Sequence, residues 1–260
     1  MITAVITFSP EGAALAKRLV DKFPGWLMYL HEKVSGNWNA ERFTSVFKLV
    51  PTIFNKYSGL IFIGPCGIAV RSIAPHLRHK TLDPAVVVVD VMGRWAVSLV
   101  SGHEGGANGL ALAVGNALGA EPVVSTTTEA LKDLTVGIGC RRGTPSTNIV
   151  NAIQETLRQA DLKLTQVRLL SSADIKSDEV GLLIAARELD IPLRFISSEE
   201  IRCCALEFQH SDFVENKVNL PAVAEPCALL AGRRTRLIIK KKICDGVAIA
   251  VAKESCSLLE

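Results

Sequence analysis

The sequence has 260 residues, of which 48% are hydrophobic and 21% charged, with a net charge of +3, as in an ordinary globular protein of one large or two modest domains. This charge is too small to indicate a nucleic-acid-binding protein, and an aromatic content of 5% is too low to supply stacking platforms for single strands. No apolar run is long enough to cross a bilayer, and the N-terminus lacks the basic lead of a signal peptide. None of the seven cysteines forms a Cys-x-x-Cys pair. We therefore expect a cytoplasmic protein with reduced thiols and neither membrane nor nucleic-acid partners.

Strand-like and helix-like segments alternate through the first half of the chain, which is typical of a layered α/β fold. We expect strands at residues 5–8, 26–30, 59–63, 85–90, 95–100 and 121–126. We expect helices at residues 10–20 and 107–118, a helix after Gly67 that Pro75 ends, and a mostly helical stretch at 40–57 interrupted at Pro51. Residues 59–63 are apolar on both faces, as expected at the centre of a parallel sheet.

The second half begins after a short polar segment, residues 127–132, which predicts a boundary between domains 1–131 and 132–260. Here we expect strands at 135–140 and 193–196, and helices at 182–189 and 222–231. A further helix should begin with Thr144 as its cap and Pro145 in its first position. Asp245-Gly246 predicts a terminal β-hairpin. The prediction is two three-layer α/β/α domains, the first with a mostly parallel sheet and the second with a mixed sheet ending in that hairpin.

Three strand-to-helix loops are candidate ligand sites, because ligands of open parallel sheets bind beyond the carboxyl ends of the strands. Free N–H groups and the helix dipole favour anions there. The first loop carries Gly64, Gly67 and Arg71, whose guanidinium suits a carboxylate. The alternative for this loop is a structural turn with a surface arginine.

The second loop gives the sharpest signal, because it places three glycines around a histidine and a glutamate. Its candidate ligand-binding residues are Ser101, Gly102, Gly105, Gly106 and Asn108. His103 is a candidate general base, since the free imidazole titrates near neutrality. Ser101 lacks the Gly-x-Ser-x-Gly spacing of a nucleophile elbow and is assigned a capping or hydrogen-bonding role.

The third loop has glycines whose spacing misses that of a dinucleotide site by one residue. Its candidate ligand-binding residues are Gly139, Arg141, Arg142, Gly143 and Thr144. The two arginines suit a carboxylate or a phosphate, and the alternative is that both face solvent. The following acids, Asp178 and Glu179, are explained by a helix start that favours negative charge.

Several runs of the sequence resemble the CbiG family. Residues 59–64, 67–71, 83–88, Ser101-Gly102-His103 and 105–108 are similar to its amino-terminal domain. Residues 136–143, Lys176 with Asp178-Glu179, 223–225 and 228–230 are similar to its carboxy-terminal domain, which itself resembles the CobE protein. Family members usually carry a further segment between these regions, whereas here Thr128 reaches Leu134 almost directly. Glu104 stands where an apolar residue is expected and inherits no family role.

The resemblance implies a cobalt-precorrin-5A hydrolase of anaerobic cobalamin biosynthesis, which opens the ring-A δ-lactone and releases acetaldehyde to give cobalt-precorrin-5B. His103 would be the base, and N–H groups around Gly102 to Gly106 would stabilise the oxyanion. Arg71, Arg141 and Arg142 would hold the carboxylates of a tetrapyrrole substrate. Cobalt arrives in that substrate, so we expect no cofactor and no protein metal site. The expected partners are neighbouring pathway enzymes and a second copy of the chain as a homodimer.

Two other functions remain open at this point. One is a non-catalytic protein that binds and hands over corrinoid intermediates. The other is a nucleotide-dependent enzyme, which rests only on the glycine-rich loops.

Overall fold

The computed structural model describes residues 2–209, 215 and 217–255. The chain forms two compact units, Met1–Thr126 and Thr127–Glu260, so the division falls after Thr126 where the sequence placed it after Leu131. Within the described residues, no helix has the length and apolar character needed to cross a membrane.

The first unit is built on a seven-stranded sheet in the order β3-β2-β1-β4-β5-β6-β7. Its strands are β1 (Thr3–Thr7), β2 (Leu27–His31), β3 (Glu41–Phe43), β4 (Gly59–Ile63), β5 (Ala85–Val89), β6 (Trp95–Val100) and β7 (Glu121–Val123). Strands β1 to β5 are all parallel, whereas β6 runs antiparallel to β5 and β7 runs parallel to β6. The sheet is therefore mostly parallel, as predicted.

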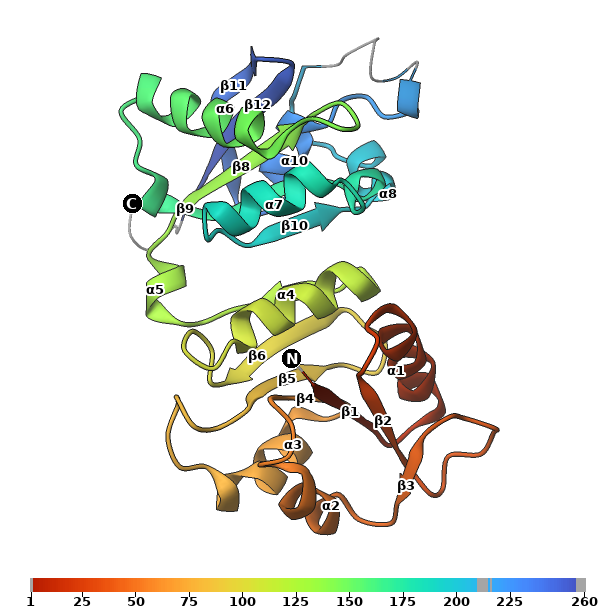
Figure 1. Ribbon diagram of the computed structural model, residues 1–260. Coiled ribbons are helices and arrows are strands. Elements are labelled where there is room, and N and C mark those ends of the chain that lie inside the picture. The colour runs from red at the N-terminus through yellow and green to blue at the C-terminus, as the bar shows by residue number, and fades with distance from the viewer. Residues whose placement is uncertain (1, 210–214, 216, 256–260) are drawn as a thin grey trace. The chain divides into compact units, whose positions relative to one another are not determined.

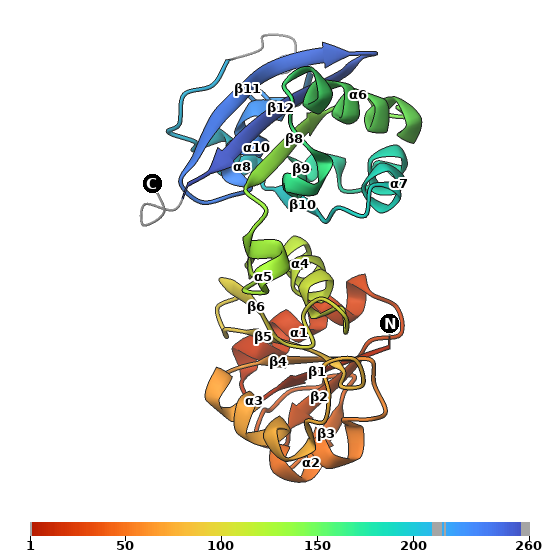
Figure 2. The same ribbon diagram turned by 90° about the vertical axis from the view of Figure 1, so that its left-hand side faces the viewer.

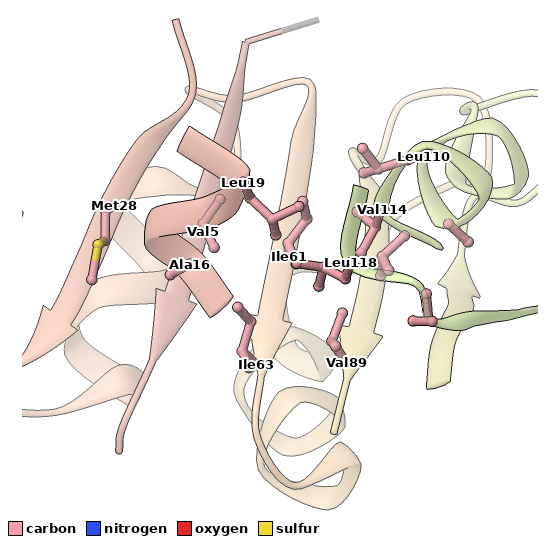
Figure 3. Close-up of a cluster of buried hydrophobic side chains, with 14 of the residues drawn as sticks. Val5, Ala16, Leu19, Met28, Ile61, Ile63, Val89, Leu110, Val114 and Leu118 are labelled. Atoms are coloured by element: carbon pink, nitrogen blue, oxygen red, sulfur yellow. The ribbon is translucent and has the colours of Figure 1, made fainter. Parts of the chain in front are cut away.

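Helices cover both faces of this sheet and complete the three layers (Figure 1). Helices α1 (Pro10–Lys22) and α4 (Ala107–Leu118) pack on one face, and α2 (Val46–Ile53) and α3 (Cys66–Ile73) pack on the other, with the short 3-10 turn η1 (Ala74–His76) after α3. Between α1, α4 and the sheet, buried side chains such as Leu19, Ile61 and Val114 interlock (Figure 3). Ser9 caps α1 through a 3.1 Å hydrogen bond from the N–H of Gly12, and Gly119 ends α4, as predicted.

The prediction for residues 40–57 is wrong in two respects. The stretch begins with the strand β3, and Pro51 lies inside α2 without interrupting it. Proline removes the hydrogen bond to the carbonyl four residues earlier. That residue, Phe47, is exposed, so water can satisfy its carbonyl and the helix continues.

The second unit is built on a five-stranded sheet in the order β10-β9-β8-β12-β11. Its strands are β8 (Leu134–Gly139), β9 (Val167–Ala173), β10 (Leu193–Ile196), β11 (Thr235–Cys244) and β12 (Val247–Glu254). Strands β8, β9 and β10 are parallel, and β12 is antiparallel to both β8 and β11. The sheet is thus mixed and ends in the predicted hairpin, whose two long strands are clear in Figure 2.

Helices again pack on both faces of the second sheet. Helices α6 (Ser146–Gln159) and α7 (Val180–Glu188) pack on one face, and α8 (Ser198–Arg202) and α10 (Ala224–Leu230) on the other. Three short elements complete the unit: α5 (Thr127–Ala130), η2 (Leu164–Gln166) and η3 (Asp174–Lys176). The predicted start of α6 is wrong by one residue, because Pro145 itself is the cap and the Thr144 hydroxyl donates to the Arg141 carbonyl at 2.8 Å.

Candidate functional site

The candidate loops of the first unit lie at opposite edges of its sheet. The loop with Gly64 and Gly67 follows β4, at the edge where β5 ends, since Ile63 pairs with Val89. The loop from Ser101 follows β6, at the edge where β5 begins, since Val100 pairs with Val86. At 3.3 Å per strand residue, the two loops are about 16 Å apart along the strands. The structure therefore does not bring them together.

The expectation that all three loops follow parallel strands is wrong for the loop from Ser101. The cause is the tight connection at residues 90–94 between β5 and β6, which makes these two strands a hairpin. Asp90 holds this turn by accepting backbone N–H groups from Met92, Arg94 and Trp95 at 2.7 to 3.3 Å. Burial opposes its charge, but these bonds and the Arg94 guanidinium lower the pKa of the Asp90 carboxyl.

The first loop lies at the carboxyl end of β4, where a parallel sheet presents ligand sites. Gly64 lies against the Phe8 ring, and its N–H donates to the Val89 carbonyl at 2.9 Å. Arg71 folds back toward Gly67, with its guanidinium 3.5 Å from the place where a Cβ on that glycine would be. Arg71 is exposed, and its guanidinium has no partner in the part of the chain that the structure describes.

The second loop is folded tightly around Ser101. This residue adopts a left-handed conformation, with φ of 60°, and is only 6% exposed. A Cβ on Gly105 would lie 2.3 Å from the Ser101 Cβ, so only glycine fits there. Gly106 caps α4 with φ of 87°, and the N–H of Ala107 donates to the Ser101 carbonyl at 3.0 Å. The loop is therefore a compact turn that delivers the chain from β6 into α4.

Asn108 joins this turn to the end of the first unit. Its Oδ1 accepts from the Ser98 hydroxyl at 2.8 Å, and its Nδ2 donates to the Thr126 hydroxyl at 2.9 Å. Its own N–H donates to the Gly102 carbonyl at 3.0 Å. Gly102 packs so closely that a Cβ there would lie 2.6 Å from Thr126 Cγ2. These contacts give Gly102 and Asn108 a structural role, beside the ligand contact predicted for them.

The side chains of His103 and Glu104 in the second loop face solvent. His103 and Glu104 are both exposed. Lys80 donates to Glu104 in an ion pair, which lowers the pKa of the Glu104 carboxyl. Glu104 therefore stays ionised and paired with Lys80 near neutral pH.

The third loop follows the carboxyl end of β8, and the next segment of the chain holds it. Arg142 donates to Asp178 at 3.0 Å and to the Ile175 carbonyl at 3.5 Å. The Gly143 N–H donates to Glu179 Oε1 at 2.9 Å. Arg141 is exposed, and its guanidinium has no partner among the described residues. Arg141 thus has a guanidinium without a partner among the described residues, whereas Arg142 already donates to Asp178 and Ile175.

Sequence reasoning missed what Glu179 does, because a helix start alone seemed sufficient to explain it. The Glu179 side chain is 5% exposed and lies 3.7 Å from the Lys176 ammonium, itself 12% exposed. Cys140 lies near both charges, and burial raises the pKa of its thiol. The spacing of three residues between Lys176 and Glu179 could have predicted their ion pair, but nothing in the local sequence predicts that Glu179 also accepts from the Gly143 N–H.

Gly139 ends β8, and packing does not require a glycine there. A Cβ on it would make only ordinary contacts, with Ala248, Val223 and Ala224 at 3.5 to 3.8 Å. Among residues 2–209, 215 and 217–255, no group of three or more His, Cys, Asp or Glu side chains is arranged to hold a metal ion.

Two family models match the chain, one for each unit. "Cobalamin synthesis G N-terminal" matches residues 48–129, and "Cobalamin synthesis G C-terminus" matches residues 134–252. The chain belongs to the cobalamin synthesis G family. Only residues 130–133 lie between the two matched regions, which agrees with the short connection noted in the sequence.

Curated relatives align with most of the chain. A protein of Priestia megaterium named cobalt-precorrin-5A hydrolase is 25% identical over 352 positions, covering 96% of this chain and 94% of the relative. A Salmonella typhimurium protein of the same name is 26% identical and covers 87% and 91%. Protein CobE of a Sinorhizobium species is 30% identical, covering 48% of this chain and 83% of the relative. Since 352 positions exceed the 260 residues of this chain, the Priestia protein has residues with no counterpart here. These relatives support a role in cobalamin biosynthesis.

Proposed function

We propose that this family member is a cobalt-precorrin-5A hydrolase, which opens the ring-A δ-lactone of its substrate and releases acetaldehyde. The observation that carries the proposal is the similarity to two proteins of that name over 94% and 91% of their lengths. Both units are included, because the two family models match one unit each.

In the proposed reaction, water adds to the lactone carbonyl and the ester C–O bond breaks. The hydroxyl so released on the two-carbon fragment then loses its proton while the carbon–carbon bond to the ring breaks. Acetaldehyde leaves, and the ring carbon keeps the electron pair and takes up a proton. The first step needs a base for the water and donors for the carbonyl oxyanion.

We assign His103 as the base and the N–H groups of the turn from Gly102 to Gly106 as the oxyanion donors. The exposure of His103 supports its role, because a base must reach a bound water. Arg141 is the stronger candidate for a substrate carboxylate, since its guanidinium lacks a protein partner among the described residues. Arg71 lacks one too, but its loop lies at the opposite edge of the sheet from the loop of His103. Arg142 would exchange its ion pair with Asp178 for a substrate carboxylate.

The test is an anaerobic incubation with cobalt-precorrin-5A, with trapping of acetaldehyde and a mass measurement of the product. The wild-type chain should release acetaldehyde. His103→Ala should lower the rate by about 10²-fold or more, the size of a general-base contribution. A rate within a few-fold of wild type would show that His103 is not the base. Glu104→Gln is the matched control, because it changes the neighbouring exposed residue and should leave the rate nearly unchanged.

One observation favours a second function, that of a non-catalytic protein that binds and hands over corrinoid intermediates. The relative from Priestia megaterium contains residues that this chain lacks, and catalysis could depend on them. In the same incubation, this function predicts substrate binding without any release of acetaldehyde.

A further inference from the structure

The buried hydroxyl of Ser101 has no hydrogen-bond partner among the described residues. Among the described residues, three buried hydroxyls lack a hydrogen-bond partner, those of Thr3, Ser101 and Thr156. Thr3 lies in the strand β1 and Thr156 in the helix α6, within regular structure. Ser101 alone lies in a loop at the start of a helix. A buried hydroxyl without a partner destabilises the protein, because it loses its bonds to water.

The Ser101 side chain lies at the amino-terminal end of α4, a helix of 12 residues. A Cβ built on Gly105 would lie 2.3 Å from the Ser101 Cβ, and the Ser101 carbonyl accepts the first N–H of the helix, from Ala107. The first four N–H donors of the helix belong to residues 107–110. Asn108 donates to the Gly102 carbonyl and Leu110 to the Gly106 carbonyl, which leaves the Gly109 N–H without a partner in the described chain. Gly109 is exposed, and a Cβ on it would meet nothing within 4 Å. Two unused donors therefore remain at this helix start, in the field of its dipole.

We propose that the Ser101 hydroxyl donates a hydrogen bond to a carboxylate of the bound tetrapyrrole at the start of α4. The proposal rests on the proposed function for the identity of the ligand. The hydroxyl is covered in the free protein, so the turn from Gly102 to Gly106 must shift to admit the carboxylate. The nearby Glu104 carboxylate is paired with Lys80, which limits its repulsion of an anion.

Removing the Ser101 hydroxyl should weaken ligand binding without lowering the stability of the free protein. Ser101→Ala removes no hydrogen bond from the free protein, so its urea midpoint should equal or exceed that of the wild type. Ser101→Gly also relieves the left-handed φ of 60° and should raise the midpoint further. Both variants should nevertheless bind the ligand less tightly. A structural role for the hydroxyl would instead lower stability.

The experiment measures binding of uroporphyrin, a stable polycarboxylate tetrapyrrole, by absorbance titration and by the amide NMR signals of residues 101–109. In the wild type these signals should shift, and Ser101→Ala and Ser101→Gly should each weaken binding at least about ten-fold, as expected for a hydrogen bond to a charged group. Thr156→Val is the matched control, because it removes another buried hydroxyl without a partner and should leave binding unchanged.

Three results would overturn the proposal: no binding of uroporphyrin to the wild type, equal binding by the Ser101 variants, or a lowered urea midpoint in both variants. None of these readouts depends on acetaldehyde release. A wild-type chain that binds uroporphyrin through Ser101 but releases no acetaldehyde from cobalt-precorrin-5A would refute the proposed reaction and leave this site in place.

Discussion

Substituting alanine for Gly105 should lower the stability of the first unit, whereas substituting it for Gly109 should raise it. In Gly105→Ala, the new Cβ would lie 2.3 Å from the Ser101 Cβ and 2.8 Å from the Ser101 carbonyl oxygen. Carbon atoms in contact are about 3.5 to 4.0 Å apart, so the backbone of the turn must move by more than about 1 Å. Such overpacking destabilises a protein by about 1–3 kcal/mol. In Gly109→Ala, the Cβ meets nothing within 4 Å, and alanine in a helix stabilises by about 0.5–1 kcal/mol.

Urea denaturation followed by tryptophan fluorescence measures this difference in the right unit. The chain has three tryptophans, Trp26, Trp38 and Trp95, and all lie in the first unit. The signal therefore reports the unfolding of the unit that contains both glycines. The midpoint should fall for Gly105→Ala and rise for Gly109→Ala. If the midpoint of Gly105→Ala matches that of the wild type, the close approach of Gly105 to Ser101 does not exist in solution and the account of this turn is wrong.

Three further predictions concern the polar contacts and the thiols. Glu179→Gln should destabilise the second unit by about 1–3 kcal/mol, because Lys176 loses its buried partner, whereas Arg142→Gln breaks an exposed pair worth less than about 1 kcal/mol. Thermal unfolding followed by circular dichroism compares the two variants, and equal losses of stability would contradict the buried pairing of Glu179 with Lys176. The lowered pKa of Asp90 means that its ionised form stabilises the first unit above the unfolded pKa of about 3.9, and that this contribution is lost as the pH falls through the folded pKa. Asp90→Asn should therefore lose less stability than the wild type as the pH falls. If the two proteins lose stability equally in acid, the hydrogen bonds of Asp90 in the β5–β6 turn do not act as described. Of the six cysteines in the described residues, iodoacetamide at pH 7.5 should label the exposed Cys66 and Cys203 first and Cys227 last, because burial raises the pKa of the Cys227 thiol. Peptide mass spectrometry gives the order, and early labelling of Cys227 would contradict its burial.

The sequence alone determined the elements whose signals are local. Residues 59–63, 95–100 and 193–196 were predicted as strands with the bounds that β4, β6 and β10 have, because short apolar runs bounded by turn residues specify strands. The helical spacing of 107–118 and the glycine after it likewise gave α4 its bounds. The layered α/β class followed from the alternation of these elements, and the family resemblance came from motifs spread over both units.

The sequence also contained the information that sets the direction of β6, although the prediction did not use it. Its connection to β5, residues 90–94, is too short for a parallel crossover, so the sequence held the signal that the loop from Ser101 lies at the opposite edge from Gly64. The motif of glycines around His103 indicated a ligand site equally well at either edge of the sheet, so the short connection at residues 90–94 was not taken into account.

Only the tertiary structure decided which polar groups meet. The bond from the Gly143 N–H to Glu179, the Asn108 contact with Thr126 and the close approach of Gly105 to Ser101 all depend on how the backbone folds back on itself. Local spacing determines periodicity and capping, but the partner of a buried polar atom is set by packing between separate segments. For this reason the sequence predicted a ligand site in the loop from Ser101 to Asn108, and only the structure showed that the Ser101 hydroxyl is buried without a hydrogen-bond partner among the described residues.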